Sequence, residues 1–246
     1  MFFRTRFAFL TAVTLSLTLV GAPLAQAQGG LEGTQDVLSQ LDNAFPPDTG
    51  NILSSRFELV PGSDKIAADD LIVPAGLAWW WVTNMAFVGN MCLDGGMGDQ
   101  VWMVFYNNSG DTDNGKPGTV FTQAAATVTE GTAGNCAGQI TNITYHLTPQ
   151  TTVWLRSGAK YWVSIHSIAP GDNPFARRLY WAGRSGVYTL TQPAFYYSGG
   201  SLTACNREWV ERRVCDGTTL GDDMTWSMTY TAFNPNFLYL TTLSRQ

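Results

Sequence analysis

Short runs of β-branched and aromatic residues recur from residue 56 onward, separated by clusters of Gly, Pro, Asn and Asp. Runs of this length with turn residues between them predict many short β-strands, as in a sandwich or barrel, rather than alternating strands and helices. The predicted strands cover residues 56–60, 71–73, 79–88, 101–106, 119–128, 140–147, 160–168, 179–183, 195–197, 207–210, 225–231 and 237–240.

Side chains alternate in character within several of these runs. In residues 160–168, Trp162, Ser164 and His166 share one face, and in residues 225–231, Trp226 and Met228 alternate with serine and threonine. Such alternation is typical of strands with one buried and one solvated face, as in an antiparallel two-sheet β-sandwich. The chain has neither an internal repeat nor a second zone of composition, so we expect one all-β, jelly-roll-like domain over residues 56–246.

The first 27 residues have the order of a secretory signal peptide. Arg4 and Arg6 precede an uninterrupted run of apolar and small residues at 7–20, and Ala25-Gln26-Ala27 resembles a cleavage site. The run is shorter than the roughly 20 residues that span a membrane, although an N-terminal anchor helix is the alternative. We therefore expect a protein that is secreted, either extracellular or periplasmic, and that is not inserted into a membrane.

Residues 28–55 are rich in Gly, Gln, Asp, Asn and Pro and contain few apolar residues. We interpret this segment as a flexible leader. One short helix could begin in it at Thr34 or Asp36 and would end before Pro46-Pro47.

The charge balance is acidic. The chain has 14 basic and 19 acidic residues, and loss of Arg4 and Arg6 with the signal peptide would change the net charge from −5 to −7. This balance argues against nucleic acid and against an anionic membrane as partners.

Four cysteines are consistent with an oxidising compartment and allow three pairings. Cys205 and Cys215 lie ten residues apart, so we expect a local bridge between them, and Cys92 then pairs with Cys136. Zinc is the rival interpretation, but the sequence has no C-x-x-C spacing.

The stretch Ala68-Asp69-Asp70-Leu71-Ile72-Val73-Pro74-Ala75-Gly76, followed by Trp79, resembles the opening of a β-sandwich accessory module of secreted bacterial proteins. Segments at 104–106, 116–118 and 158–165, and a Cys-x-Trp-x-Cys-like segment before the last strand, follow in the order of that module. The resemblance covers about residues 56–232 and implies an extracellular accessory or adhesive module with no assigned catalytic residue. The sequence departs from the module in its tripled tryptophan at 79–81 and in the expected Cys92–Cys136 pair.

Catalytic patterns are scarce. His146 and His166 are the only histidines, and each lies in a predicted strand, where we expect it to point outward. The sequence has no G-x-S-x-G elbow, no HExxH and no glycine-rich phosphate loop. A carboxylate-dependent glycan hydrolase or lyase is the alternative function, but the acidic residues show no pattern that predicts two facing carboxylates.

Calcium is the metal that the sequence supports best. Asp111 and Asp113 place hard oxygen ligands on alternate residues, as at the start of a calcium loop, although Lys116 stands where an EF-hand requires glycine. The same residues also suit an ordinary polar turn. Asp69-Asp70 and Asp222-Asp223 are weaker candidates.

Nine tryptophans are many for a chain of 246 residues, and a sandwich needs only some of them in its core. Alternation places Trp162 beside His166, and it places Trp80 on the opposite face from Trp79 and Trp81. Exposed indoles can stack on sugar rings, so Trp80, Trp162 and His166 are the predicted ligand-binding residues, with core positions as the alternative. The sequence thus favours a non-catalytic secreted module that binds a polysaccharide or a cell-surface protein, or acts in a matrix.

Overall fold

Three consecutive tryptophans open β5 (Trp79–Leu93), and this strand is central to the sheet. It pairs antiparallel with β15, β8, β11 and β9 along different parts of its length. The computed structural model describes residues 35–39, 51–57, 64–76, 79–93, 101–110, 115–130, 142–169, 177–184, 194–199, 207–216 and 223–233. All of them belong to the compact unit Glu32–Gln246, whereas the second unit, Met1–Leu31, with the predicted signal peptide, lies outside them.

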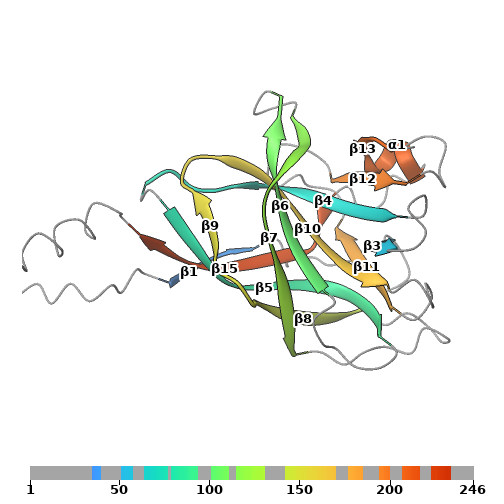
Figure 1. Ribbon diagram of the computed structural model, residues 1–246, viewed down its shortest axis with the longest axis horizontal. Coiled ribbons are helices and arrows are strands. Elements are labelled where there is room, and N and C mark those ends of the chain that lie inside the picture. Colours follow the sequence, from blue (N-terminus) through green and yellow to red (C-terminus); the bar gives the residue numbers. More distant parts are fainter. Residues whose placement is uncertain are drawn as a thin grey trace, which may run out of the picture. The chain divides into compact units, whose positions relative to one another are not determined.

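The described residues form fifteen strands and one short helix (Figure 1). The N-terminal strands are β1 (Gln35–Ser39), β2 (Asn51–Leu53), β3 (Ser55–Phe57), β4 (Lys65–Ile72), β5, β6 (Val101–Ser109) and β7 (Lys116–Glu130). They are followed by β8 (Ile143–Pro149), β9 (Val153–Arg156), β10 (Lys160–Ala169), β11 (Arg177–Arg184) and β12 (Phe195–Ser198). The last elements are β13 (Trp209–Glu211), helix α1 (Arg212–Asp216), β14 (Asp223–Met224) and β15 (Trp226–Phe233).

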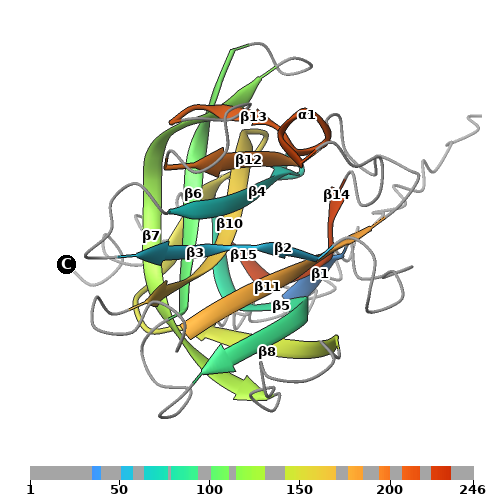
Figure 2. The same ribbon diagram turned by 90° about the vertical axis from the view of Figure 1, so that its right-hand side faces the viewer.

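These strands join into one mixed sheet with the order β1-β15-β5-β8-β7-β6-β10-β3-β4-β12-β13. Strands β2, β9, β11 and β14 pair with it off this path, and β10 also pairs with β4. The pairing of β10 with β3 is parallel, whereas the other pairings in the described part of the chain are antiparallel. Figure 2 shows β12 and β13 beside β4, in the order in which they pair.

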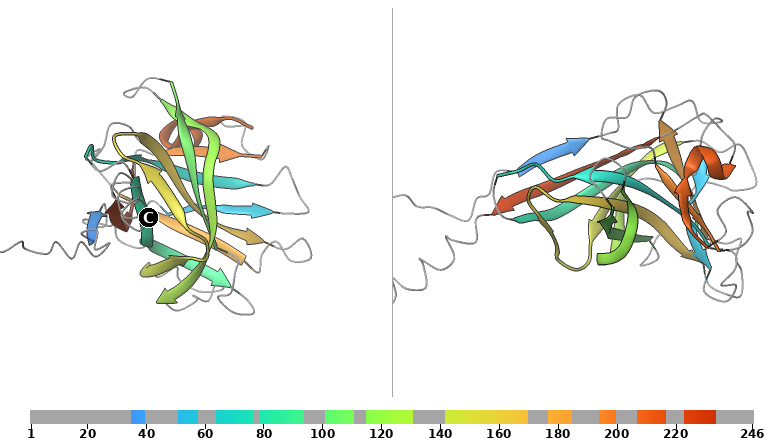
Figure 3. Two further views of the ribbon diagram at one scale, coloured as in Figure 1. Left: turned by 60° about the vertical axis from the view of Figure 1, so that its left-hand side comes forward. Right: turned by 90° about the horizontal axis from the view of Figure 1, so that it is seen from above.

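The expected helix near Thr34 or Asp36 is wrong, because Gln35–Ser39 is strand β1. It pairs antiparallel with β15, from Gln35 opposite Thr231 to Ser39 opposite Ser227 (Figure 3). Strand β2 from the same segment pairs with β11. The sheet therefore includes strands from the segment that the sequence assigned to a flexible leader, because β15 and β11 supply backbone partners that local composition does not reveal.

One large hydrophobic core receives side chains from most of the strands. Its largest fully buried members are Trp181, Trp226, Tyr145, Phe87 and Phe105. A second, smaller core contains Ala68, Val104, Tyr106, Trp162 and Phe195, with Trp102 and Trp209 packed against it. Because β4, β6 and β10 contribute to both cores, these strands are buried on two sides rather than one.

Ten of the predicted strands are confirmed in overlapping form, as β3, β5, β6, β7, β8, β10, β11, β12, β13 and β15. The run at 71–73 is only the end of β4, which starts at Lys65 and includes the acidic pair Asp69-Asp70. Strand β9 and helix α1 were not predicted. The predicted strand at 237–240 lies outside the described residues. No helix in the described part of the chain is long and apolar enough to cross a membrane.

Candidate functional site

Four aromatic side chains form a patch on the face of β5, β9 and β15 that points away from the core. We call Trp79, Trp81, Trp154 and Phe233 the aromatic patch. The three tryptophans are 36%, 38% and 39% exposed, respectively, and Phe233 is half-buried. Trp81 lies 6.2 Å from both Trp154 and Phe233 between ring centroids, and Trp154 lies 5.3 Å from Phe233. The rings of Trp81, Trp154 and Phe233 are therefore contiguous, and each of the three indoles leaves more than a third of its residue surface open to solvent.

The sheet register explains why these rings lie together. Trp81 stands opposite Trp154 of β9 on one side and Thr231 of β15 on the other, and Trp79 stands opposite Phe233. Directly opposed residues on neighbouring strands place their side chains on the same face, about 5 Å apart.

A β-bulge decides which face of β5 carries the exposed tryptophans. Tyr230 pairs with Val82 and Thr229 pairs with Asn84, so Thr83 is an extra residue in β5. Trp80 and Val82 point into the core before the bulge, and Met85, Phe87 and Met91 do so after it. An extra residue reverses the side-chain parity of a strand, so uninterrupted alternation back from Phe87 would have buried Trp79 and Trp81.

The prediction that Trp80 is an exposed ligand-binding residue is therefore wrong. Trp80 is 4% exposed and lies in the large core. Its ring stacks on Tyr230 with a centroid distance of 3.4 Å and an interplanar angle of 5°. Alternation correctly placed Trp80 on the opposite face from Trp79 and Trp81, but the exposed face is that of Trp79 and Trp81.

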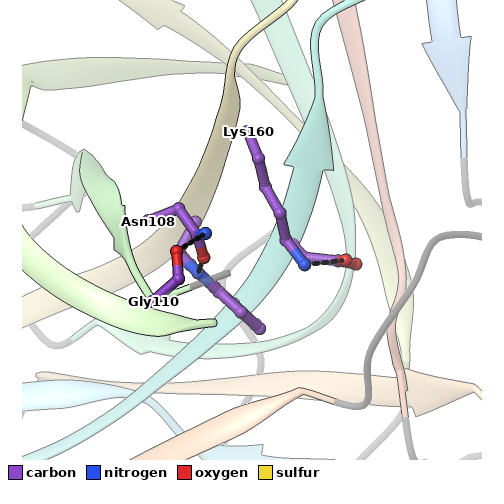
Figure 4. A network of polar contacts seen from close by, with 5 residues as sticks. Asn108, Gly110 and Lys160 are labelled. Carbon is purple, nitrogen blue, oxygen red and sulfur yellow. Dashed lines mark hydrogen bonds and ion pairs between the residues drawn. The ribbon is translucent and has the colours of Figure 1, made fainter. Parts of the chain in front are cut away.

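Trp162 is also buried, so its prediction as an exposed sugar-stacking residue is wrong. Its indole nitrogen donates a hydrogen bond to Asn108 Oδ1 at 2.9 Å, and Lys160 Nζ lies 5.0 Å from the ring centroid. Lys160 forms a buried ion pair with Asp70 at 3.1 Å, and Asn108 Nδ2 donates to the carbonyl of Gly110 (Figure 4). Trp162 is thus fixed by packing and by a satisfied N–H group, which are features of a core residue.

His166 does not point outward into solvent, contrary to the expectation from the sequence. It is 4% exposed and lines a cleft of about 200 Å³ on the side of β10 that carries the smaller core. Its Nδ1 lies 3.3 Å from the hydroxyl of Ser164, which is itself fully buried. Burial and, to a lesser extent, the charge of Arg56 together lower the pKa of His166 to about 4, so the imidazole is neutral near pH 7.

The cleft lies over β3, β4, β6, β7 and β10. Its lining residues are Arg56, Asp64, Ile66, Trp102, Val104, Tyr106, Val120, Gln123, His166 and Ile168. His166 of β10 stands directly opposite Trp102 of β6, so these two rings lie side by side on one face of the sheet. Burial raises the pKa of Tyr106, so its hydroxyl stays protonated.

Asp64 is the only carboxylate among the residues that line the cleft. Its Oδ2 lies 4.0 Å from Nε of Arg56, and the two side chains are 18% and 60% exposed. Acid–base hydrolysis of glycosidic bonds uses two carboxyl groups about 5–9.5 Å apart. The lining therefore supplies polar recognition groups but not that pair.

A separate group of acidic side chains is buried between β4 and β14. Asp69 Oδ2 accepts hydrogen bonds from the backbone N–H of Met224 at 3.1 Å and from the indole of Trp226 at 3.0 Å. The pKa of Asp69 is raised well above its usual value, first by burial and then by the charges of Asp223 and Asp70. The arrangement ties β4 to β14 and β15, and none of these acidic residues lines the cleft.

Asp111 and Asp113, the predicted calcium ligands, lie outside the described residues. Within the described ranges, no group of three or more His, Cys, Asp or Glu side chains could hold a metal ion. Cys215 is buried in α1 and is disulfide-bonded, whereas Cys136 and Cys205 lie outside the described residues. The two predicted cysteine pairings therefore stay predictions.

Comparison with protein-family models, with curated proteins and with solved structures gives no match for this chain. Sequence reasoning missed Trp154 and Phe233, and it did not connect Arg56, Asp64 and Trp102 with His166. Alternation could have shown which residues share a face with Trp102 in β6, and which share a face with His166 in β10. Only the pairing register could have shown that these faces adjoin.

Proposed function

We propose that this protein is a secreted, non-catalytic module that binds a polysaccharide through the aromatic patch. The observation that supports the proposal most directly is the exposure of Trp79, Trp81 and Trp154 on one face of the sheet, where Phe233 stands opposite Trp79 and contacts the rings of Trp81 and Trp154. Exposed large apolar groups that gather in one place, rather than singly, mark interaction sites.

Indole rings suit a sugar chain for a physical reason. Each ring presents a flat apolar face, on which the C–H face of a pyranose ring can stack with little loss of conformational entropy. Three indoles and one phenyl ring offer several such contacts, which suits a polymer with repeated rings better than one small molecule. Arg156, exposed and directly opposite Trp79, adds a hydrogen-bond donor beside the patch.

The alternative function, a carboxylate-dependent glycan hydrolase or lyase, has weaker support. The aromatic patch includes no carboxylate, and the cleft lining includes one, Asp64, which faces Arg56. Binding is therefore the function that the described residues support best.

Several further expectations belong to the same proposal. The shared core that receives side chains from most strands supports a jelly-roll-like, two-sheet packing of the domain. The N-terminal sequence and the cysteines support export, with bridges Cys205–Cys215 and Cys92–Cys136. A structural calcium at Asp111 and Asp113 and the likeness to an extracellular accessory module complete the proposal.

The test is a pull-down of residues 28–246 on insoluble cellulose, chitin, xylan and peptidoglycan, with calcium or with a chelator, followed by assay of the supernatant for released sugar. Each stacked ring contributes about 1 kcal/mol, so Trp81→Ala and Trp154→Ala should each weaken retention by about fivefold. Trp81→Phe should restore part of it.

Val214→Ala is the control variant, because Val214 is an exposed apolar residue on α1, away from the patch. Retention that is equal in Trp81→Ala, Trp154→Ala and Val214→Ala would exclude the patch as the binding surface. Released sugar would instead support the enzyme.

A further inference from the structure

Separately from the aromatic patch, we propose that the cleft around His166 is a second binding site, which takes a single uncharged sugar ring or a polyol ring of the same chemistry. The proposal does not depend on the function assigned to the aromatic patch. It rests on the volume, the walls and the charge balance of the cleft.

The walls of the cleft are apolar on several sides. Val104 is buried in the smaller core, and Ile66, Val120 and Ile168 complete the apolar lining. Trp102 is half-buried, so part of its indole faces the cleft. A volume of about 200 Å³ is below the range of drug-sized pockets, about 300–1,000 Å³, and so suits a single small ring.

Polar groups of complementary kind stand among these apolar walls. Arg56 offers N–H donors, Asp64 offers carboxylate acceptors, and the amide of the exposed Gln123 offers both. A ring hydroxyl is at once a donor and an acceptor, so vicinal hydroxyls can bond to a carboxylate and a guanidinium that stand side by side. A carboxylate has several lone pairs and a guanidinium several N–H donors, so one ligand hydroxyl can donate to Asp64 while another accepts from Arg56, 4.0 Å away between Nε and Oδ2.

The charge balance favours an uncharged ligand. The positive charge of Arg56 is balanced by Asp64 within the lining, and His166 is neutral near pH 7. A carboxylate or phosphate ligand would place its negative charge beside Asp64. A neutral ring has no such penalty, and its apolar face can pack on Trp102.

The experiment titrates the protein, residues 28–246, with the methyl glycosides of glucose, galactose, mannose and N-acetylglucosamine, and with glucuronate as the charged comparison. Binding is measured by saturation-transfer NMR and calorimetry. At least one neutral glycoside should bind in the millimolar range. Asp64→Asn should weaken that binding by about tenfold or more, because a hydrogen bond to a charged group is lost.

Matched variants separate the two sites. Glu211→Gln removes another surface carboxylate that is paired with an arginine, Arg213, and it should leave binding unchanged. Trp81→Ala disrupts the aromatic patch and should also leave binding of the single ring unchanged. Gln123→Ala is an exposed substitution that should weaken binding without affecting folding, and thermal unfolding checks each variant.

Three results would overturn the proposal. The first is that no neutral glycoside binds the folded protein, and the second is that glucuronate binds more tightly than every neutral glycoside. The third is that binding is lost in Trp81→Ala and kept in Asp64→Asn and Gln123→Ala, which would assign it to the aromatic patch. Retention on insoluble polysaccharide is tested through Trp81 and Trp154, and binding of a single ring is tested through Asp64 and Gln123. The patch proposal and the cleft proposal can therefore fail independently.

Discussion

Protonation of His166 should cost this protein a measurable part of its stability. The side chain is 4% exposed, and its pKa is about 4 instead of 6.5, because burial and the nearby Arg56 disfavour the imidazolium. A histidine whose pKa is depressed by folding binds its proton more readily in the unfolded chain. Its contribution to stability is therefore complete above about pH 6.5 and is lost as the pH falls towards 4.

The size of the effect follows from the two pKa values. The difference between 6.5 and about 4 corresponds to about 3 kcal/mol, at 1.36 kcal/mol per pKa unit. His166→Gln substitutes a neutral polar side chain that has no proton to gain in this range. The free energy of unfolding of the unmodified protein should therefore fall by about 3 kcal/mol more than that of the variant between neutral pH and pH 4.

Urea unfolding followed by tryptophan fluorescence, at a series of pH values from 7 to 4, measures both curves. The comparison isolates His166, because every other titrating group is present in both proteins. Parallel curves for the two proteins would refute the reasoning, since they would mean that the imidazole titrates normally in the folded state.

Three further substitutions test other parts of the structure. Asp69→Asn should raise the free energy of unfolding at neutral pH and flatten its dependence on pH, because the raised pKa of Asp69 makes the unmodified protein lose stability as the pH rises towards that pKa. Thermal unfolding across a pH series measures this, and equal pH dependence in the two proteins would mean that the carboxyl titrates normally. Lys160→Ala should lower the free energy of unfolding by about 3–5 kcal/mol in urea, because it leaves Asp70 buried without its cation; a loss below about 1 kcal/mol would contradict this. Gly89→Ala should cost about 1–3 kcal/mol, because the added Cβ would clash with the backbone carbonyl oxygen of Tyr180 and would push β5 from β11. An unchanged melting temperature would exclude that close approach.

Local pattern predicted much of the strand content. The alternation of Tyr161, Val163 and Ile165 against Trp162 and His166 matches the two faces of β10. Aromatic and β-branched runs also located β5, β6 and β15, because these residues fit a pleated, packed surface wherever it lies in the chain.

Burial could not be predicted in the same way. The sequence suggested a solvated face for β10, but the smaller core, with Phe195 of β12 at its edge, covers that face. The predicted strand at 71–73 left out the acidic pair Asp69-Asp70, but both residues are buried in β4, and Lys160, 90 residues away in the chain, pairs with Asp70 inside the fold. Each of these outcomes depends on a partner that is remote in sequence.

The sequence by itself determined where most strands run and which side chains share a face, because the two-residue period of a strand is a local property of the backbone. Tertiary structure decided which face meets the solvent. One extra residue at Thr83 reverses the parity of β5, buries Trp80 against Tyr230 and exposes Trp79 and Trp81. That reversal follows from pairing with β15, about 150 residues later in the chain, so the aromatic patch exists only in the folded protein.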